Sequence, residues 1–164
     1  AFLFSESIED NIKMGRQEAS YQEMIEASKK ADIHRSIKRF KNGYKTLLGE
    51  RGLTLSGGQI QRVSIARALI KDPKILLFDD CLSAVDTDTE EKILKNLNEF
   101  CQDKTTVIVS HRISSVRDAD RIIVLDHGKI IENGPHQKLL DLKGHYFDLF
   151  NKQQRLKELN CSKT

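Results

Sequence analysis

Leu55-Ser56-Gly57-Gly58-Gln59 is the stretch that decides how this 164-residue sequence is interpreted. Ser56 can accept a hydrogen bond at the start of a helix, and the two glycines leave no Cβ between the backbone and a ligand. The first turn of that helix presents free N–H groups and the positive end of its dipole. The stretch therefore predicts a phosphate-facing turn, with an ordinary capped helix after a glycine turn as the plainer alternative.

The residues after this turn predict a helix from Gln59 to Lys71, which Pro73 ends. The apolar side chains expected on its inner face are Ile60, Val63, Ala66, Leu69 and Ile70. Arg62, Arg67 and Lys71 are expected to point elsewhere.

The stretch before Asp72 is predicted to be mostly helical. Ser20 and Glu23 form a capping-box pattern at the start of an amphipathic segment. A shorter amphipathic piece, residues 34–40, is followed by Asn42-Gly43, a pattern typical of a left-handed helix stop.

Beyond Pro73, strands alternate with helices. Ile75–Phe78 is apolar at every position, which predicts a parallel strand covered on both faces. The spacing of Ile93, Leu94, Leu97 and Phe100 predicts a helix with a charged outer side. Further elements are expected as a second buried strand at 105–109, a strand at 121–125, a hairpin through 126–132 and a helix over 137–159.

The predicted fold class is thus α/β. We expect a helical subdomain over residues 1–72 and an α/β half-core over 73–164, with a partial, mostly parallel sheet and flanking helices.

Asp79 and Asp80 come directly after the apolar strand. Ligands bind at the carboxyl edge of parallel sheets, and two adjacent acids there can hold Mg²⁺ and orient a water molecule. A solvated turn after a strand is the alternative, since Asp is common in turns.

Composition excludes several classes of protein. Hydrophobic residues at 38% and charged residues at 31% fit a globular domain, and no apolar run approaches the length of a membrane-spanning helix. Three cysteines without metal-ligand spacing indicate reduced thiols. A net charge of only +3 without a basic stripe argues against nucleic acid as a partner. The opening Ala-Phe-Leu-Phe shows no secretory leader, so we expect a chain cut from a longer protein.

The glycine turn is followed by Gln61 and Arg62, then by the paired acids, and later by His111 in Ser110-His111-Arg112. This order of motifs resembles the nucleotide-binding domain of an ABC transporter. The resemblance is strongest to the exporter class and implies a P-loop NTPase-like fold that uses ATP and Mg²⁺. It identifies Leu55–Gln59 as the signature motif, which contacts the γ-phosphate of ATP held by a second nucleotide-binding domain.

The same resemblance implies roles for the other motifs. Asp79 would support Mg²⁺ through water, and Asp80 would occupy the position of the catalytic base. Ser83-Ala84-Val85-Asp86 resembles the D-loop, which crosses the dimer interface, although alone it is a helix cap. His111 would be the switch histidine that stabilises charge in the transition state, whereas a lone histidine is more often structural.

Asp80 departs from the family pattern, which has Glu at this position. Its carboxylate is drawn back by about 1.5 Å, and a misplacement of that scale can cost on the order of a hundredfold in rate. This resembles the weaker of two ATP sites in asymmetric exporters, and we hypothesise a heterodimer. A homodimer that tolerates Asp is the competing possibility.

Two segments favour an exporter. Residues 2–12 resemble the stretch after the Q-loop, and Glu50 and Arg51 lie in a Gly-Glu-Arg-Gly loop that resembles the contact with the coupling helices of a transmembrane domain. Otherwise that pair would be a surface ion pair. The resemblance places the parent protein at the cytoplasmic face of the cell membrane. The alternatives are a DNA-repair or chromosome-type ABC ATPase, expected to carry a coiled coil, and a non-enzymatic interaction module.

The sequence holds no Gly-x-x-x-x-Gly-Lys-Ser/Thr loop to cradle the β- and γ-phosphates. We therefore expect this chain alone not to hydrolyse ATP. We also expect unpaired strand edges and exposed apolar surface.

Overall fold

The computed structural model describes residues 1–49 and 54–161. The chain forms two compact units, residues 1–109 and 110–164, and each is described by itself. The division predicted at residue 72, between a helical subdomain and an α/β part, stays a prediction.

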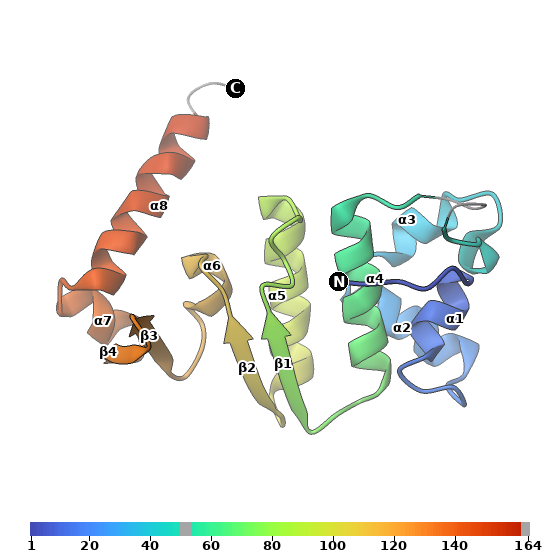
Figure 1. The fold of residues 1–164 in the computed structure, drawn as a ribbon, viewed down its shortest axis with the longest axis horizontal. Helices are drawn as coiled ribbons and strands as arrows, with labels where there is room; N and C mark the ends of the chain where they lie inside the picture. The colour runs from blue at the N-terminus through green and yellow to red at the C-terminus, as the bar shows by residue number, and fades with distance from the viewer. Residues whose placement is uncertain (50–53, 162–164) are drawn as a thin grey trace. The chain divides into compact units, whose positions relative to one another are not determined.

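Among the described residues of the first unit, helices α1 to α4 and one short 3₁₀ turn precede the strands (Figure 1). Its elements are α1 (Ile8–Lys13), α2 (Tyr21–Lys30), α3 (His34–Lys38), η1 (Gly43–Lys45), α4 (Gly57–Ile70), β1 (Ile75–Asp79), α5 (Thr87–Cys101) and β2 (Thr105–Val109). The capping box predicted at Ser20 and Glu23 is confirmed at the start of α2. Gly43 has φ +51°, so the predicted left-handed residue is present, although α3 already ends at Lys38.

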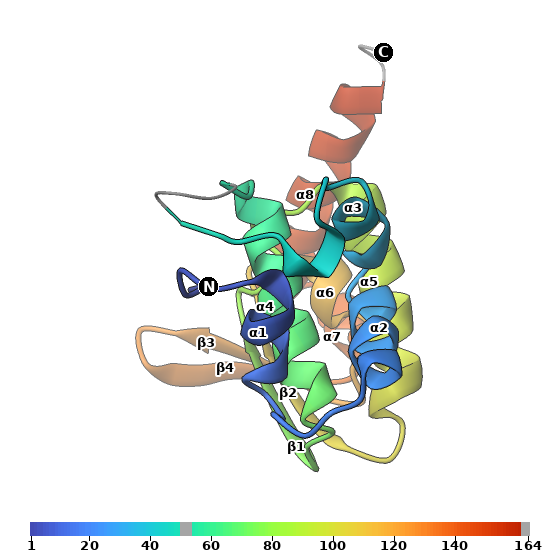
Figure 2. The ribbon, with the colours of Figure 1, turned by 90° about the vertical axis from the view of Figure 1, so that its right-hand side faces the viewer.

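The α4 helix forms the centre of this unit and packs against both α1 and α2, as Figure 2 shows. Val63 and Ala66 are fully buried, and Ile65 is buried as well, so apolar contact extends beyond the predicted inner face. Arg62 and Arg67 do leave that face, but they contact other parts of the chain. Arg62 Nη1 donates to the Asp32 carbonyl at 2.7 Å, and Arg67 Nε donates to the Asn11 carbonyl at 2.7 Å.

The strands β1 and β2 form a parallel pair in which Leu77 lies opposite Val107. Leu76 and Phe78 are buried in the core with residues of α4 and α5, whereas Ile75 is 70% exposed and Leu77 is 68% exposed. The prediction that both faces of β1 are covered is therefore wrong for this chain, because the described helices of the first unit cover only the face that carries Leu76 and Phe78. β2 was expected to be buried and instead alternates between exposed and half-buried positions. The expected exposed apolar surface is confirmed.

The second unit contains α6 (Ile113–Val116), β3 (Ile122–Asp126), β4 (Lys129–Gly134), α7 (His136–Asp141) and α8 (His145–Cys161). The predicted hairpin is confirmed, and its turn uses positive φ at His127 (+45°) and Gly128 (+74°), as a type I′ turn requires. Within the described residues β3 pairs only with β4, so the sheet content is one parallel pair and one antiparallel hairpin. The small core of the second unit is formed by Ile113, Ile122, Leu139 and Tyr146.

The α/β class is thus confirmed. Among the residues that the structure describes, no helix has the length and apolar character needed to cross a membrane.

Candidate functional site

Ser56 begins α4 as its N-cap, with extended backbone angles (φ −66°, ψ 159°). Its Oγ accepts the Gln59 N–H at 3.3 Å, and its own N–H donates to Gln59 Oε1 at 3.0 Å. This reciprocal capping box holds the first turn of the helix at the surface, directly after the buried Leu55. The predicted cap is confirmed, and the turn presents a helix N-terminus, which favours an anion.

Gly58 is needed by the chain itself, not only by a ligand, whereas the fold leaves room for a side chain at Gly57. A Cβ on Gly58 would lie 2.8 Å from the carbonyl oxygen of Ala84, which is closer than Cβ atoms tolerate. A Cβ on Gly57 would meet only the Ala84 Cβ at 3.4 Å. The loop of residues 83–86 therefore lies directly against the start of α4.

Gln61 makes the polar part of this contact. Its Oε1 accepts the Ala84 N–H at 3.0 Å, and its Nε2 donates to Ser83 Oγ at 3.0 Å. The sequence marked Gln61 only as part of a resemblance, because no local pattern links it to residues more than 20 positions away. A polar side chain on the second turn of α4, on the face that carries Gly57 and Gly58, was the available signal.

Asp79 and Asp80 stand at the carboxyl end of β1 and are exposed, at the edge of the sheet where the sequence placed them. The Asp80 N–H donates to the Val109 carbonyl at 2.9 Å, which extends the parallel ladder by one residue. Asp80 then turns the chain with φ +44°, a left-handed conformation that Asp tolerates better than most residues.

The acids lie apart from any larger cluster of metal ligands. Among the described residues, no group of three or more His, Cys, Asp or Glu side chains is placed to hold a metal ion. Two carboxylates suit an Mg²⁺ ion that takes most of its oxygen ligands from elsewhere, and the role of Asp79 and Asp80 toward Mg²⁺ stays a prediction.

Asp86 closes the loop as the N-cap of α5. Its Oδ1 accepts the Thr89 N–H at 3.0 Å, and this hydrogen bond holds the pKa of the Asp86 carboxyl below its usual range. The helix-cap interpretation of Asp86 is confirmed, while its D-loop role stays a prediction.

Cys81 follows Asp80 and is half-buried with a free thiol. Burial raises the pKa of this thiol to about 11, and the neighbouring carboxylates of Asp80 and Asp79 act in the same direction. The thiol is therefore neutral near pH 7.

His111 lies in the second unit, where Gln153 of α8 holds its backbone. The Gln153 Nε2 donates to the His111 carbonyl at 2.7 Å, and the Gln153 Oε1 accepts the Ile113 N–H at 2.9 Å. The role of the His111 ring stays a prediction, and Glu50 and Arg51 lie outside the described residues.

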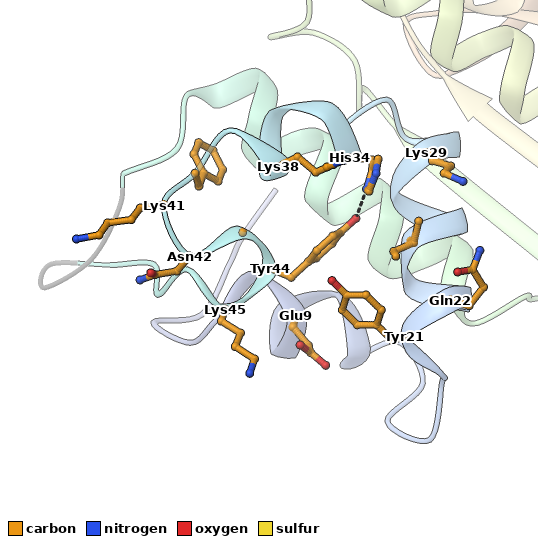
Figure 3. Close-up of a pocket in the computed structure, with 13 residues that line it drawn as sticks. Glu9, Tyr21, Gln22, Lys29, His34, Lys38, Lys41, Asn42, Tyr44 and Lys45 are labelled. Carbon is orange, nitrogen blue, oxygen red and sulfur yellow. Dashed lines mark hydrogen bonds between the residues drawn. The ribbon is translucent and has the colours of Figure 1, made fainter.

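A separate groove of about 640 Å³ lies among α1, α2, α3 and η1 (Figure 3). Its floor holds a hydrogen bond of 2.8 Å between His34 Nδ1 and the Tyr44 hydroxyl. Lys38, Lys41 and Lys45 lie at its rim and point in different directions in Figure 3, so they do not converge on one position. None of the predicted site residues lines this groove.

Comparison with known proteins gives consistent matches. The sequence profile of the ABC transporter family matches residues 2–83. "ABC transporter B family member 16" of Arabidopsis thaliana is 44% identical over 162 residues, which are 99% of this chain and 13% of that protein. "Putative multidrug export ATP-binding/permease protein YgaD" of Bacillus subtilis (strain 168) is 45% identical over 152 residues, which are 93% of this chain and 26% of that protein.

Among solved structures, a bacterial Atm1-family ABC exporter with ATP bound matches with a TM-score of 0.88 and 46% identity. The match covers 93% of this chain and 27% of that one. The chain thus spans about a quarter or less of the length of these relatives.

Proposed function

Because this chain belongs to the ABC transporter family, we propose that it is the later part of the ATP-binding domain of an exporter, in which ATP hydrolysis drives export of a substrate. The observation that carries the proposal is the close packing of two motifs within the first unit. A capped glycine turn at a helix N-terminus lies against the loop that follows two exposed carboxylates. The ATP-bound exporter that shares this fold supports it.

The turn at Leu55–Gln59 acts on the γ-phosphate of an ATP molecule held by a second nucleotide-binding domain. Its exposed N–H groups and helix dipole suit a phosphate, and Ser56 and Gln59 keep the turn in shape without any ligand. The site is completed only in a dimer, and Ser83 and Asp86 lie in the loop that crosses the interface.

Asp79 and Asp80 serve the chain's own ATP site. Asp79 supports Mg²⁺ through water, Asp80 orients the attacking water, and His111 contacts the γ-phosphate. The short side chain of Asp80 leaves this site slow, so the partner is a different chain with a complete catalytic site. Glu50 and Arg51 contact the transmembrane domain at the cytoplasmic face of the membrane.

This chain alone does not hydrolyse ATP, since it lacks the phosphate loop that positions the β- and γ-phosphates. A Mg²⁺-dependent ATPase rate of the 164-residue chain that Asp79→Asn abolishes would contradict this part of the proposal.

The proposal as a whole is tested by Asp80→Glu in the longer protein that carries this chain. We expect the ATPase rate at this chain's own site to rise by one to two orders of magnitude (about 10- to 100-fold), because the carboxylate regains about 1.5 Å of reach. The matched control is Asp88→Glu, at an exposed position in the first turn of α5, which should leave the rate unchanged. An unchanged rate in Asp80→Glu would reject the weakened site.

A further inference from the structure

The side chain of Gln61 forms a polar bridge between the second turn of α4 and the loop of residues 83–86. It uses both ends of its amide, accepting from the Ala84 N–H and donating to Ser83 Oγ, each at 3.0 Å. Since the Ala84 N–H can only donate, the orientation of the amide is determined by its partners.

The hydrogen bonds continue from the loop to the acidic end of β1. Ser83 Oγ receives the Gln61 amide and donates to the Asp80 carbonyl at 3.0 Å. The backbone of Asp80 is in turn joined to β2 through the Val109 carbonyl. One chain of hydrogen bonds therefore runs from α4 through Ser83 to the residue that carries the candidate catalytic acid.

The glycine turn is joined to the same loop by packing. The Ala84 carbonyl lies where a Gly58 side chain would start, so turn and loop can approach only because Gly58 has no Cβ. On another side, Arg62 Nε donates to the Gly58 carbonyl at 3.3 Å and its Nη1 donates to the Asp32 carbonyl at 2.7 Å. The turn is therefore held by contacts on two sides.

We propose that Gln61 is a positioning residue that fixes the glycine turn and Asp80 relative to each other within one chain. This inference rests on the proposed function, under which the turn serves ATP on the partner domain while Asp80 serves the chain's own ATP. Gln61 then keeps the turn, which serves one ATP site, at a constant separation from Asp80, which serves the other, so a displacement at one site also affects the other.

The test replaces Gln61 with Met, which has a similar length and no amide. The matched control is Gln22→Met, which removes an exposed side-chain hydrogen bond of 3.0 Å to Glu26 on α2. Amide hydrogen exchange at Ala84 is measured in the 164-residue chain, and kcat and KM for ATP are measured in the longer protein.

We expect Gln61→Met to speed exchange at Ala84 and to lower kcat about tenfold, since loss of positioning acts on the chemical step. KM for ATP should stay within about twofold, because the proposed ATP-contacting atoms are all retained. Ser83→Ala added to Gln61→Met should lower kcat little further, because both changes break the same chain of hydrogen bonds.

A wild-type kcat in Gln61→Met, a rise in KM with kcat unchanged, or additive effects with Ser83→Ala would each overturn the positioning role. Failure of the proposed function is distinguishable, because then the wild-type longer protein would itself not hydrolyse ATP.

Discussion

Replacing Gly58 with alanine tests how closely the glycine turn and the loop of residues 83–86 approach. The new Cβ would lie 2.8 Å from the Ala84 carbonyl oxygen and 3.7 Å from the Val85 Cα, and both are backbone atoms that cannot rotate away. Overpacking of this kind typically costs ~1–3 kcal/mol. Alanine also favours a helix over glycine by up to ~1 kcal/mol, which offsets part of the clash.

Gly57→Ala is the matched control. Its Cβ would meet only the Ala84 Cβ at 3.4 Å, an ordinary contact, while it shares the gain in helix propensity. The difference between the two variants therefore isolates the clash. The free energy of unfolding of Gly58→Ala should be lower than that of Gly57→Ala by ~1–3 kcal/mol.

The assay is urea unfolding of the chain without nucleotide, followed by circular dichroism at a helix wavelength. With a denaturant slope of about 2 kcal/mol per molar for a chain of this size, the midpoint of Gly58→Ala should lie about 0.5–1.5 M below that of Gly57→Ala. Equal midpoints would refute the close approach of the Ala84 carbonyl to α4, and with it the packing half of the link between the turn and Asp80.

Three further predictions concern other contacts. Arg67→Lys should lower the free energy of unfolding by ~2 kcal/mol in the same urea assay, because an ammonium group cannot make the forked contacts to the carbonyl and side-chain oxygens of the fully buried Asn11. Equal stability would argue against those contacts. Glu132→Gln should speed hydrogen exchange at the Tyr146 amide by several-fold (~1 kcal/mol), since the Glu132 carboxylate accepts that N–H at 3.0 Å at the start of α8. An unchanged exchange rate at the Tyr146 amide would contradict the capping of α8 by Glu132. Cys81 should react with iodoacetamide at pH 8 about a hundredfold more slowly than a small thiol with an ordinary pKa, because its pKa is about 11, and the rate should rise with pH. The alkylation rate of Cys81 is measured by mass spectrometry, and a rate like that of the small thiol would contradict burial of Cys81.

Sequence patterns predicted the elements that depend on contacts between residues close together in the sequence. Ser20, Ser56 and Asp86 each cap a helix with a hydrogen bond to a backbone N–H three residues ahead, so their spacing in the sequence contains the whole interaction. The hairpin at Asp126-His127-Gly128 is local in the same sense. These elements were predictable because no distant residue decides them.

Contacts between distant residues were not predictable in this way. An apolar run such as Ile75–Phe78 shows that a strand is apolar, but it does not show how many helical layers cover it, and Leu77 is exposed here. Gln61 meets Ser83, and Arg67 meets Asn11 across 56 positions, with no periodic pattern to pair them. The turn and the acids were found as motifs, whereas the bridge between them required the structure.

The most direct measurement of the central claim is ATP hydrolysis by a mixture of this chain with a complete nucleotide-binding domain whose own signature serine has been replaced by alanine. The account predicts that neither protein hydrolyses ATP at a substantial rate alone, and that the mixture does. Gly57→Asp in this chain should abolish the restored rate, because a carboxylate at the helix N-terminus would repel the phosphate. A mixture that forms a complex, detected by sedimentation, yet restores no hydrolysis would contradict the action of the Leu55–Gln59 turn on a partner's ATP.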